Sequence, residues 1–447
     1  FEPAGHFLDA LVQNIQRCLV ARRKQLRCAI TVGSRGWRRL GPTALDPVGQ
    51  ALDDMAPLDL IAAFFLRGAM SGGQEATPML RRIRSHCAEA AERAHIGLNE
   101  DAVDAFLDTL DESEFSALKT QHGLRFPLRF SSFMDQLNFV AVLAMLNAFS
   151  GYRAAFHQAT GHGAFDCIRK IVLGMYLSAD EGDSALDTLA LERVTPSTFA
   201  QLLGVPTHSE TPHPSLPGVV VGTIGGPLRE PFEMAAKMCV ETAAFLKARQ
   251  HKNLASYVWE VCEQASRHEH VESCIVEGLA EVPAFYDALD SPYPIPIMKK
   301  ALFLVRALQG LVLDAEPHTL PRLMQILSER WRHGLGEPLP MFVDNVIPTM
   351  LIYLGMLQLE HSSILSTWHP APQDSDTSGP LVNRSDACHV RAAALVAGAR
   401  IVERARTSST WISSITEEQL DAYLWSMAKR PEFRCISRLA EQHTGMY

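Results

Sequence analysis

The sequence has no excess of basic residues and no long apolar run. Its 447 residues include 41 lysines and arginines against 50 aspartates and glutamates, so its formal net charge at pH 7 is −9. A protein that binds nucleic acid through a general positive field is therefore not expected. No apolar run approaches the ~20 residues of a membrane helix. We expect no bilayer-spanning segment and, by default, a cytoplasmic protein.

Paired cysteines and the common metal and nucleophile motifs are also missing. The nine cysteines include no CxxC pair, which fits neither a disulfide framework nor a zinc site, so we expect reduced thiols and no metal. HExxH and G-x-S-x-G do not occur. The glycine cluster 222–226 lacks the Lys-Ser/Thr of a phosphate-binding loop and the spacing of a dinucleotide fingerprint, so nucleotide binding by this loop is not expected.

What the sequence does contain is the composition of an ordinary globular protein. Hydrophobic residues make up 47% and charged residues 20%, enough to form a large core. The chain begins at Phe1 rather than at Met, so we expect it to have been trimmed. Trimming leaves open whether a targeting signal preceded it.

Apolar residues recur at steps of three and four along most of the chain, which predicts helices. Thr195 followed by Pro196, and Thr416 followed by two glutamates, are typical helix starts. We therefore predict an all-α fold with at most a minor β element. The apolar stripes that carry this prediction are Leu137–Phe149, Asp166–Leu177, Ala235–Leu246, Lys299–Leu313, Met350–Leu357 and Ala387–Arg406.

The coarse organisation is a helical domain over residues 131–447 and a less regular helical portion over residues 1–130, which could belong to the same domain. Two stretches, 204–217 and 369–380, are rich in proline or in small polar residues and are predicted to be loop insertions. The best strand candidate is Val219–Ile224, either one strand of a hairpin or an extended loop.

Three aspartates in apolar surroundings are the main functional candidates. Asp344 lies in Met341–Pro348, where burial would cost several kcal/mol unless the charge is paired or used. An N-cap role in the following helix is an equal alternative. Asp287 follows two aromatic residues, and Asp421 lies four residues before Trp425, hence on the same helix face. A helix-start aspartate and a core tryptophan with a capping aspartate explain these two equally well.

The order of several short motifs resembles the queuosine salvage protein family over about residues 135–447. Members hydrolyse the N-glycosidic bond of queuosine 5′-phosphate and release queuine. The family's aromatic cluster after Leu146-Asn147 and the acids before Val390 are replaced here, so a divergent member is expected. The matching motifs are Leu137–Phe139, Leu146–Ser150, Val282–Asp287, Lys299–Ala301, Met341–Leu351, Val390-Arg391 and Leu420–Trp425.

The resemblance implies a metal-independent hydrolase without a cofactor, acting through an oxocarbenium-like transition state. It implies a nucleoside 5′-phosphate as the small-molecule partner, and neither a membrane nor a stable nucleic-acid complex. Asp287 and Asp344 would be the catalytic pair, and Lys299 and Arg391 would bind the phosphate. The remaining substrate-binding candidates are Asn147, Phe285, Tyr286, Asp421 and Trp425.

Three alternatives remain open from the sequence. The first is an N-ribosyl hydrolase for a different base. The second is a helical protein-interaction scaffold without catalysis, which predicts no small-molecule pocket at Asp344. The third is a glycosylase that acts on bases in DNA, which would need a basic strip across the mouth of the pocket.

Overall fold

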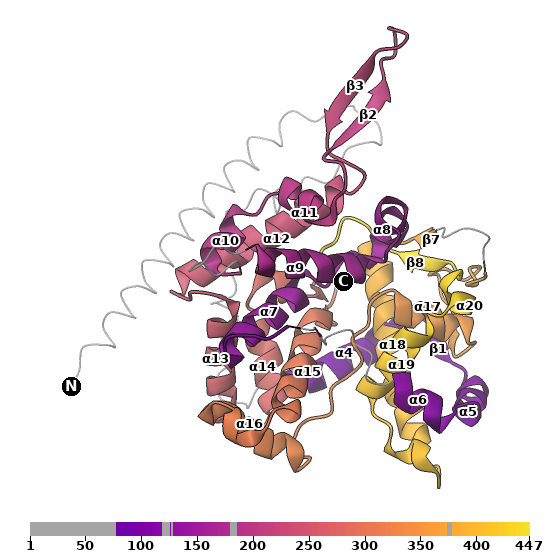
Figure 1. The fold of residues 1–447 in the computed structure, drawn as a ribbon. Helices are drawn as coiled ribbons and strands as arrows, with labels where there is room; N and C mark the ends of the chain where they lie inside the picture. The colour runs from indigo at the N-terminus through magenta and orange to yellow at the C-terminus, as the bar shows by residue number, and fades with distance from the viewer. Residues whose placement is uncertain (1–76, 119–125, 127, 179–185, 373–377) are drawn as a thin grey trace, which may run out of the picture. The chain divides into compact units, whose positions relative to one another are not determined.

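A computed structural model describes residues 77–118, 126, 128–178, 186–372 and 378–447, and these residues form a mainly helical structure (Figure 1). The compact unit runs from Thr77 to Tyr447. The prediction of an all-α fold with a minor β element is confirmed. The predicted N-terminal portion 1–130 lies mostly outside the described residues, but the helices between residues 79 and 118 are part of this unit.

The first half of the described chain contains nine helices. α4 is amphipathic, whereas α7 is apolar all round and is buried along most of its length, which marks it as a central helix of the core. The nine helices are α4 (Met79–Arg93), α5 (Glu100–Asp108), α6 (Glu112–Leu118), α7 (Phe133–Leu146), α8 (Arg153–Thr160), α9 (Ala164–Leu177), α10 (Thr188–Arg193), α11 (Pro196–Leu203) and α12 (Arg229–Ala248).

Eight further helices follow in the second half. α13 packs on α7 and α14, α15 packs on α7 and α16, and α4 lies along α18, so the two halves share one core. The eight helices are α13 (Leu254–Ala265), α14 (Val271–Leu279), α15 (Lys299–Asp314), α16 (Arg322–Arg332), α17 (Val346–Tyr353), α18 (Arg384–Ala405), α19 (Glu417–Met427) and α20 (Pro431–Arg434). Short 3₁₀ turns occur at η1 (Ser150–Tyr152), η2 (Pro283–Phe285), η3 (Pro317–Thr319) and η4 (Trp411–Ser414).

The strands of the described residues form four two-stranded sheets. Three are antiparallel and one is parallel. The hairpin of β2 and β3 projects from the ends of α11 and α12 (Figure 1). The pairs are β1 (Gly97–Leu98) with β6 (Leu357–Gln358), β2 (His208–Pro212) with β3 (Val220–Ile224), β4 (Ala288–Leu289) with β5 (Ile295–Pro296), and β7 (Ser378–Leu381) with the parallel β8 (Arg438–Ala440).

Predicted helix starts agree well with the structure. The side chains of Thr195 and Thr416 each accept a backbone hydrogen bond at the start of α11 and α19, and both form capping boxes. The stripe predicted over Met350–Leu357 is displaced, because the helix begins at Val346 and Gly355, with a φ of 74°, ends it. Leu357 then enters β6 instead.

Both predicted loop insertions contain strand residues. In the first, His208–Pro212 pairs with Val220–Ile224, so the hairpin alternative for Val219–Ile224 is confirmed and the loop prediction over 204–217 is wrong at β2. In the second, Pro372 bridges Ile436 and Ser378–Leu381 forms β7, while residues 373–377 lie outside the described residues. Proline-rich polar segments carry no alternating apolar pattern, so their pairing depends on a partner strand.

No single helix among the described residues has the length and apolar character needed to cross a membrane. α7 and the segment Ser150–Thr160 satisfy both criteria only when taken together, and they are bent by 62° at the break between them.

Candidate functional site

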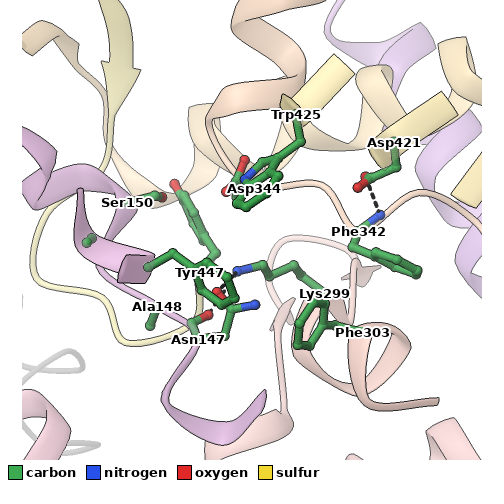
Figure 2. A pocket seen from close by; sticks show the side chains of 12 residues that line it. Asn147, Ala148, Ser150, Lys299, Phe303, Phe342, Asp344, Asp421, Trp425 and Tyr447 are labelled. Atoms are coloured by element: carbon green, nitrogen blue, oxygen red, sulfur yellow. Dashed lines mark hydrogen bonds between the residues drawn. The ribbon is translucent and has the colours of Figure 1, made fainter. Parts of the chain in front are cut away.

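Side chains from six segments that are far apart in the sequence line one cavity (Figure 2). The cavity lies beside the end of α7 and the starts of α9, α15 and α17, with one face of α19 as a further wall. The empty space among these side chains, including the open mouth, is about 510 Å³. The lining residues are Asn147, Ala148, Ser150, Ala164, Phe165, Lys299, Phe303, Phe342, Asp344, Asp421, Trp425 and Tyr447.

Two buried aspartates face this cavity, and they differ in their surroundings. Asp344 is 8% exposed, and its Oδ1 accepts the backbone N–H of Val346 at 2.7 Å, the first residue of α17. Asp421 is 4% exposed, and its Oδ2 accepts the backbone N–H of Phe342 at 2.9 Å. The N-cap of α17 is Asn345, so Asp344 lies one residue before the cap position that was predicted for it, although it still supports the helix start and also lines the cavity. Its functional role stays a prediction.

Asp421 is poised to be neutral near physiological pH. Burial, followed by the negative charge of Asp344, raises the pKa of Asp421 to about 7. The N–H of Phe342 and the charge of Lys299 oppose this shift without cancelling it. Two carboxyl groups whose environments separate their protonation states can act as an acid and as a charged group in one site.

Lys299 adds a positive charge to the same cavity. Its ammonium donates to the backbone O of Asn147 at 2.9 Å and to the Oδ1 of Asn147 at 3.0 Å. Burial lowers the pKa of Lys299 to about 8, although the charge of Asp344 counteracts this. An ammonium has three N–H donors, and the third has no partner among the described residues.

Aromatic rings form much of the wall. Phe165 contacts Trp425 edge-on with ring centroids 5.6 Å apart, and Phe303 meets Phe342 in the same way at 6.2 Å. Phe165 also lies 6.3 Å from Phe303, which joins the two pairs. Such a wall suits a flat, partly apolar ligand such as a nucleobase.

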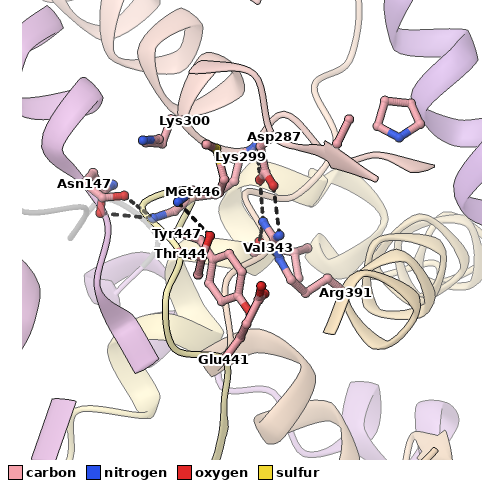
Figure 3. Close-up of polar contacts among 12 residues, drawn as sticks. Asn147, Asp287, Lys299, Lys300, Val343, Arg391, Glu441, Thr444, Met446 and Tyr447 are labelled. Carbon is pink, nitrogen blue, oxygen red and sulfur yellow. Dashed lines mark hydrogen bonds and ion pairs between the residues drawn. The ribbon is translucent and has the colours of Figure 1, made fainter. Parts of the chain in front are cut away.

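Asp287 and Arg391 form a buried ion pair outside the residues that line the cavity (Figure 3). The guanidinium binds both carboxylate oxygens, at 3.0 and 2.5 Å, and also donates to the backbone O of Val343. Burial raises the pKa of Asp287, but the charge and hydrogen bonds of Arg391 outweigh it and hold that pKa below its usual value. The ring of Tyr447 covers the guanidinium, 3.8 Å from its centroid.

This pair touches the site through the backbone of the α15 start. Oδ2 of Asp287 accepts the N–H of Lys299 at 3.3 Å, and its backbone O accepts the N–H groups of Ile297 and Met298 at 2.9 and 3.0 Å. Met298 has a φ of 53°, an unfavourable region for a residue with a side chain. Asp287 therefore fixes the turn from which Lys299 extends.

The structure brings together five of the nine predicted site residues, which are Asn147, Lys299, Asp344, Asp421 and Trp425. The other four do not line the cavity. Phe285 is fully buried in the core, and the Tyr286 hydroxyl donates to Asp290. Asp287 and Arg391 are engaged with each other and not with the cavity, and their assignment to catalysis and to phosphate binding stays a prediction.

Seven of the lining residues were not identified from the sequence. Phe342 lies within the motif Met341–Leu351, so its closeness to Asp344 in the sequence could have indicated that it lines the site. The others are apolar or small residues whose side chains carry no chemical signature, and only the fold brings them to the acids. The missed residues are Ala148, Ser150, Ala164, Phe165, Phe303, Phe342 and Tyr447, of which Ala148 and Ser150 lie in a matching motif.

The described residues contain free thiols but no cluster of possible metal ligands. Within the described ranges, no three or more His, Cys, Asp or Glu side chains are arranged to hold a metal ion. Seven cysteines of these ranges are free thiols, and Cys18 and Cys28 lie outside them. Comparison with protein-family models gives no match to this chain, and no curated protein sequence matches it significantly.

Proposed function

We propose that the chain hydrolyses the N-glycosidic bond of a nucleoside 5′-phosphate such as queuosine 5′-phosphate. The observation that carries the proposal is the presence of Asp344 and Asp421 in one aromatic cavity, with the pKa of Asp421 raised to about 7. N-glycoside hydrolysis needs this division of labour between a charged carboxylate and a carboxylic acid. The motif order described above favours the same reaction.

In the proposed reaction, the bond between ribose C1′ and the base nitrogen breaks and leaves positive charge on the sugar. The carboxylate of Asp344 stabilises this charge and accepts a proton from the attacking water. Asp421, when protonated, donates a proton to the departing base. Water adds to C1′, so the products are the free base and the phosphorylated ribose.

The aromatic wall and Asn147 supply contacts for the base. Phe165 and Trp425 offer ring faces or edges for stacking, and the Asn147 amide lies next to Lys299 at the end of α7. A helical scaffold without catalysis predicts no small-molecule pocket at Asp344, so the cavity found there argues against this alternative. No metal or cofactor takes part in the proposed steps.

The experiment is a panel of modified nucleosides and their 5′-phosphates, with chromatographic detection of free base and ribose product. We expect Asp344→Asn to lower kcat at least about a hundredfold, the scale of losing a charge-stabilising or acid–base group. The thermal midpoint should change little, because Asn can still accept the N–H of Val346. Asp108→Asn, on the exposed face of α5, is the matched control.

Three results would contradict the proposal or the catalytic role of Asp344. If no member of the panel releases a base, the reaction class is wrong. If Asp344→Asn turns over at a near-normal rate, this aspartate has no catalytic role. A large loss of stability with unchanged turnover per folded molecule would make Asp344 structural.

A further inference from the structure

Positive side chains gather beside the two rings Phe165 and Trp425, which line the cavity. The ammonium of Lys429 lies 3.5 Å from the centroid of the Trp425 ring system and 5.9 Å from that of Phe165. Lys429 is exposed, and its ammonium makes no hydrogen bond or ion pair with any described residue. Arg169 lies one turn after Phe165 on α9, and Arg434 is exposed at the end of α20.

The ammonium of Lys429 has more positive than negative charge around it. Although Lys429 is exposed, the protein packed around its ammonium lowers its pKa to about 8, and the charges of Arg169, Arg434 and Arg438 lower it further. Asp166 is the carboxylate that most strongly counteracts this shift. It is 3.8 Å from Arg169, a long ion pair, and the Nε of Arg169 is buried without a hydrogen-bond partner.

A cluster of like charges is unfavourable unless a ligand neutralises it. It is more notable in a chain whose formal net charge is −9. Both rings beside it belong to the cavity wall, so the anion that fits the cluster would be attached to whatever enters the cavity. Lys429, Arg169 and Arg434 are called the cationic rim below.

We propose that the cationic rim binds the phosphate monoester of the substrate, so that the base enters the cavity and the phosphate stays at its mouth. This inference rests on the proposed function and changes its phosphate site. Arg391 is committed to Asp287, and Lys299 uses two donors on Asn147. A phosphate dianion placed at Lys299 would also meet the charge of Asp344, which acts on the same ammonium.

The rim also gives the substrate an orientation. A ribose 5′-phosphate group at the mouth directs C1′ inward, toward the two aspartates, and a base attached to C1′ reaches the aromatic wall. A free nucleoside would fill the cavity but leave the rim unpaired. The enzyme should therefore prefer the phosphorylated substrate, and this preference should weaken as salt screens the exposed cations.

Ribose 5-phosphate is the probe that tests this site, because it is the product common to every base. We would measure its binding, and that of ribose, by isothermal titration calorimetry with the full chain. We expect ribose 5-phosphate to bind at least tenfold more tightly than ribose. Lys429→Gln should abolish this difference, and Arg434→Gln should reduce it. Lys252→Gln removes an equal charge at an exposed position of the surface and should have no effect.

A further variant separates the two possible phosphate sites. Lys299→Met should change the affinities for ribose and ribose 5-phosphate together, so that their ratio stays within threefold of the wild-type ratio. If Lys299→Met abolishes the difference between the two sugars and Lys429→Gln does not, the phosphate binds inside the cavity and the rim proposal is overturned. Equal affinities of the wild type for ribose and ribose 5-phosphate would overturn it as well.

Failure of this inference can be told apart from failure of the proposed function. Ribose 5-phosphate has no N-glycosidic bond, so its binding does not depend on catalysis. Rim-dependent binding without base release from any nucleotide would support the rim and refute the hydrolase. Base release at equal kcat/KM from free and phosphorylated nucleosides would keep the hydrolase and overturn the rim.

Discussion

Asp421→Asn should stabilise the protein, and more strongly at alkaline than at acidic pH. In the folded state, burial and the charge of Asp344 raise the pKa of Asp421 to about 7. In the unfolded chain an aspartate titrates near about 3.9. Because the folded-state pKa is the higher one, the stability from the protonated acid is fully present below the unfolded pKa and is lost as the pH rises through 7.

The size of the effect follows from the two pKa values. A difference of about three pKa units changes the free energy of unfolding by about 4 kcal/mol between the two ends of the titration range. About 2.5 kcal/mol of this change falls between pH 5 and pH 8. For a folded unit of this size, that difference shifts the thermal midpoint by about 3 °C. Asn removes the titration but can still accept the N–H of Phe342.

Differential scanning calorimetry of the wild type and Asp421→Asn at pH 5 and pH 8 measures this directly. The difference between the two proteins cancels the other titrating carboxylates, and Asp108→Asn serves as a surface control. We expect the stability advantage of Asp421→Asn to grow by about 3 °C from pH 5 to pH 8. An advantage that is the same at both pH values would refute the raised pKa and, with it, the acid role of Asp421.

Two further predictions concern the framework behind the site. Asp287→Asn leaves the guanidinium of Arg391 buried without its counter-ion and should cost about 3–5 kcal/mol, whereas Asp287→Leu combined with Arg391→Met should cost much less; equal losses in urea unfolding would show that the two charges are not coupled. Gly151→Ala places a Cβ 1.9 Å from the backbone O of Glu441, so the thermal midpoint should fall by several degrees. Gly310→Ala, which meets open space in α15, should be neutral or stabilising by up to about 1 kcal/mol, and equal midpoints for the two variants would contradict the steric reasoning.

The helices could be predicted because their signal is local. The stripes over Asp166–Leu177 and Lys299–Leu313 match α9 and α15 closely, since each helix buries one apolar face. The strands could not be predicted in this way. β1, β4, β5 and β6 have two residues each, and a pair of residues carries no period. Their pairing is set by neighbours brought close by the helices.

The site was predicted in part for a related reason. An aspartate among apolar residues must be paired, hydrogen-bonded or functional, and the sequence cannot tell which. The partner of Asp287 is Arg391, 104 residues further along the chain, so the sequence alone does not show that Asp287 is a paired aspartate. Asp421 received the weaker prediction because a helix-face aspartate is ordinary, yet its burial beside Asp344 makes it the second acid of the cavity.

Asp287 and Asp344 differ in how strongly they could interact with a positively charged substrate. Asp287 already has the counter-ion that an ionised buried carboxylate requires, so an approaching ribosyl cation would have to compete with a bidentate guanidinium. Asp344 has a single hydrogen bond from Val346, and no ion pair within the described part of the chain. A positive charge that develops at the sugar would therefore gain more from Asp344. Burial first, and then the charge of Asp344, raise the pKa of Asp421 to about 7. The charge that suits Asp344 to stabilise the cation therefore also helps Asp421 to hold the proton that it would donate.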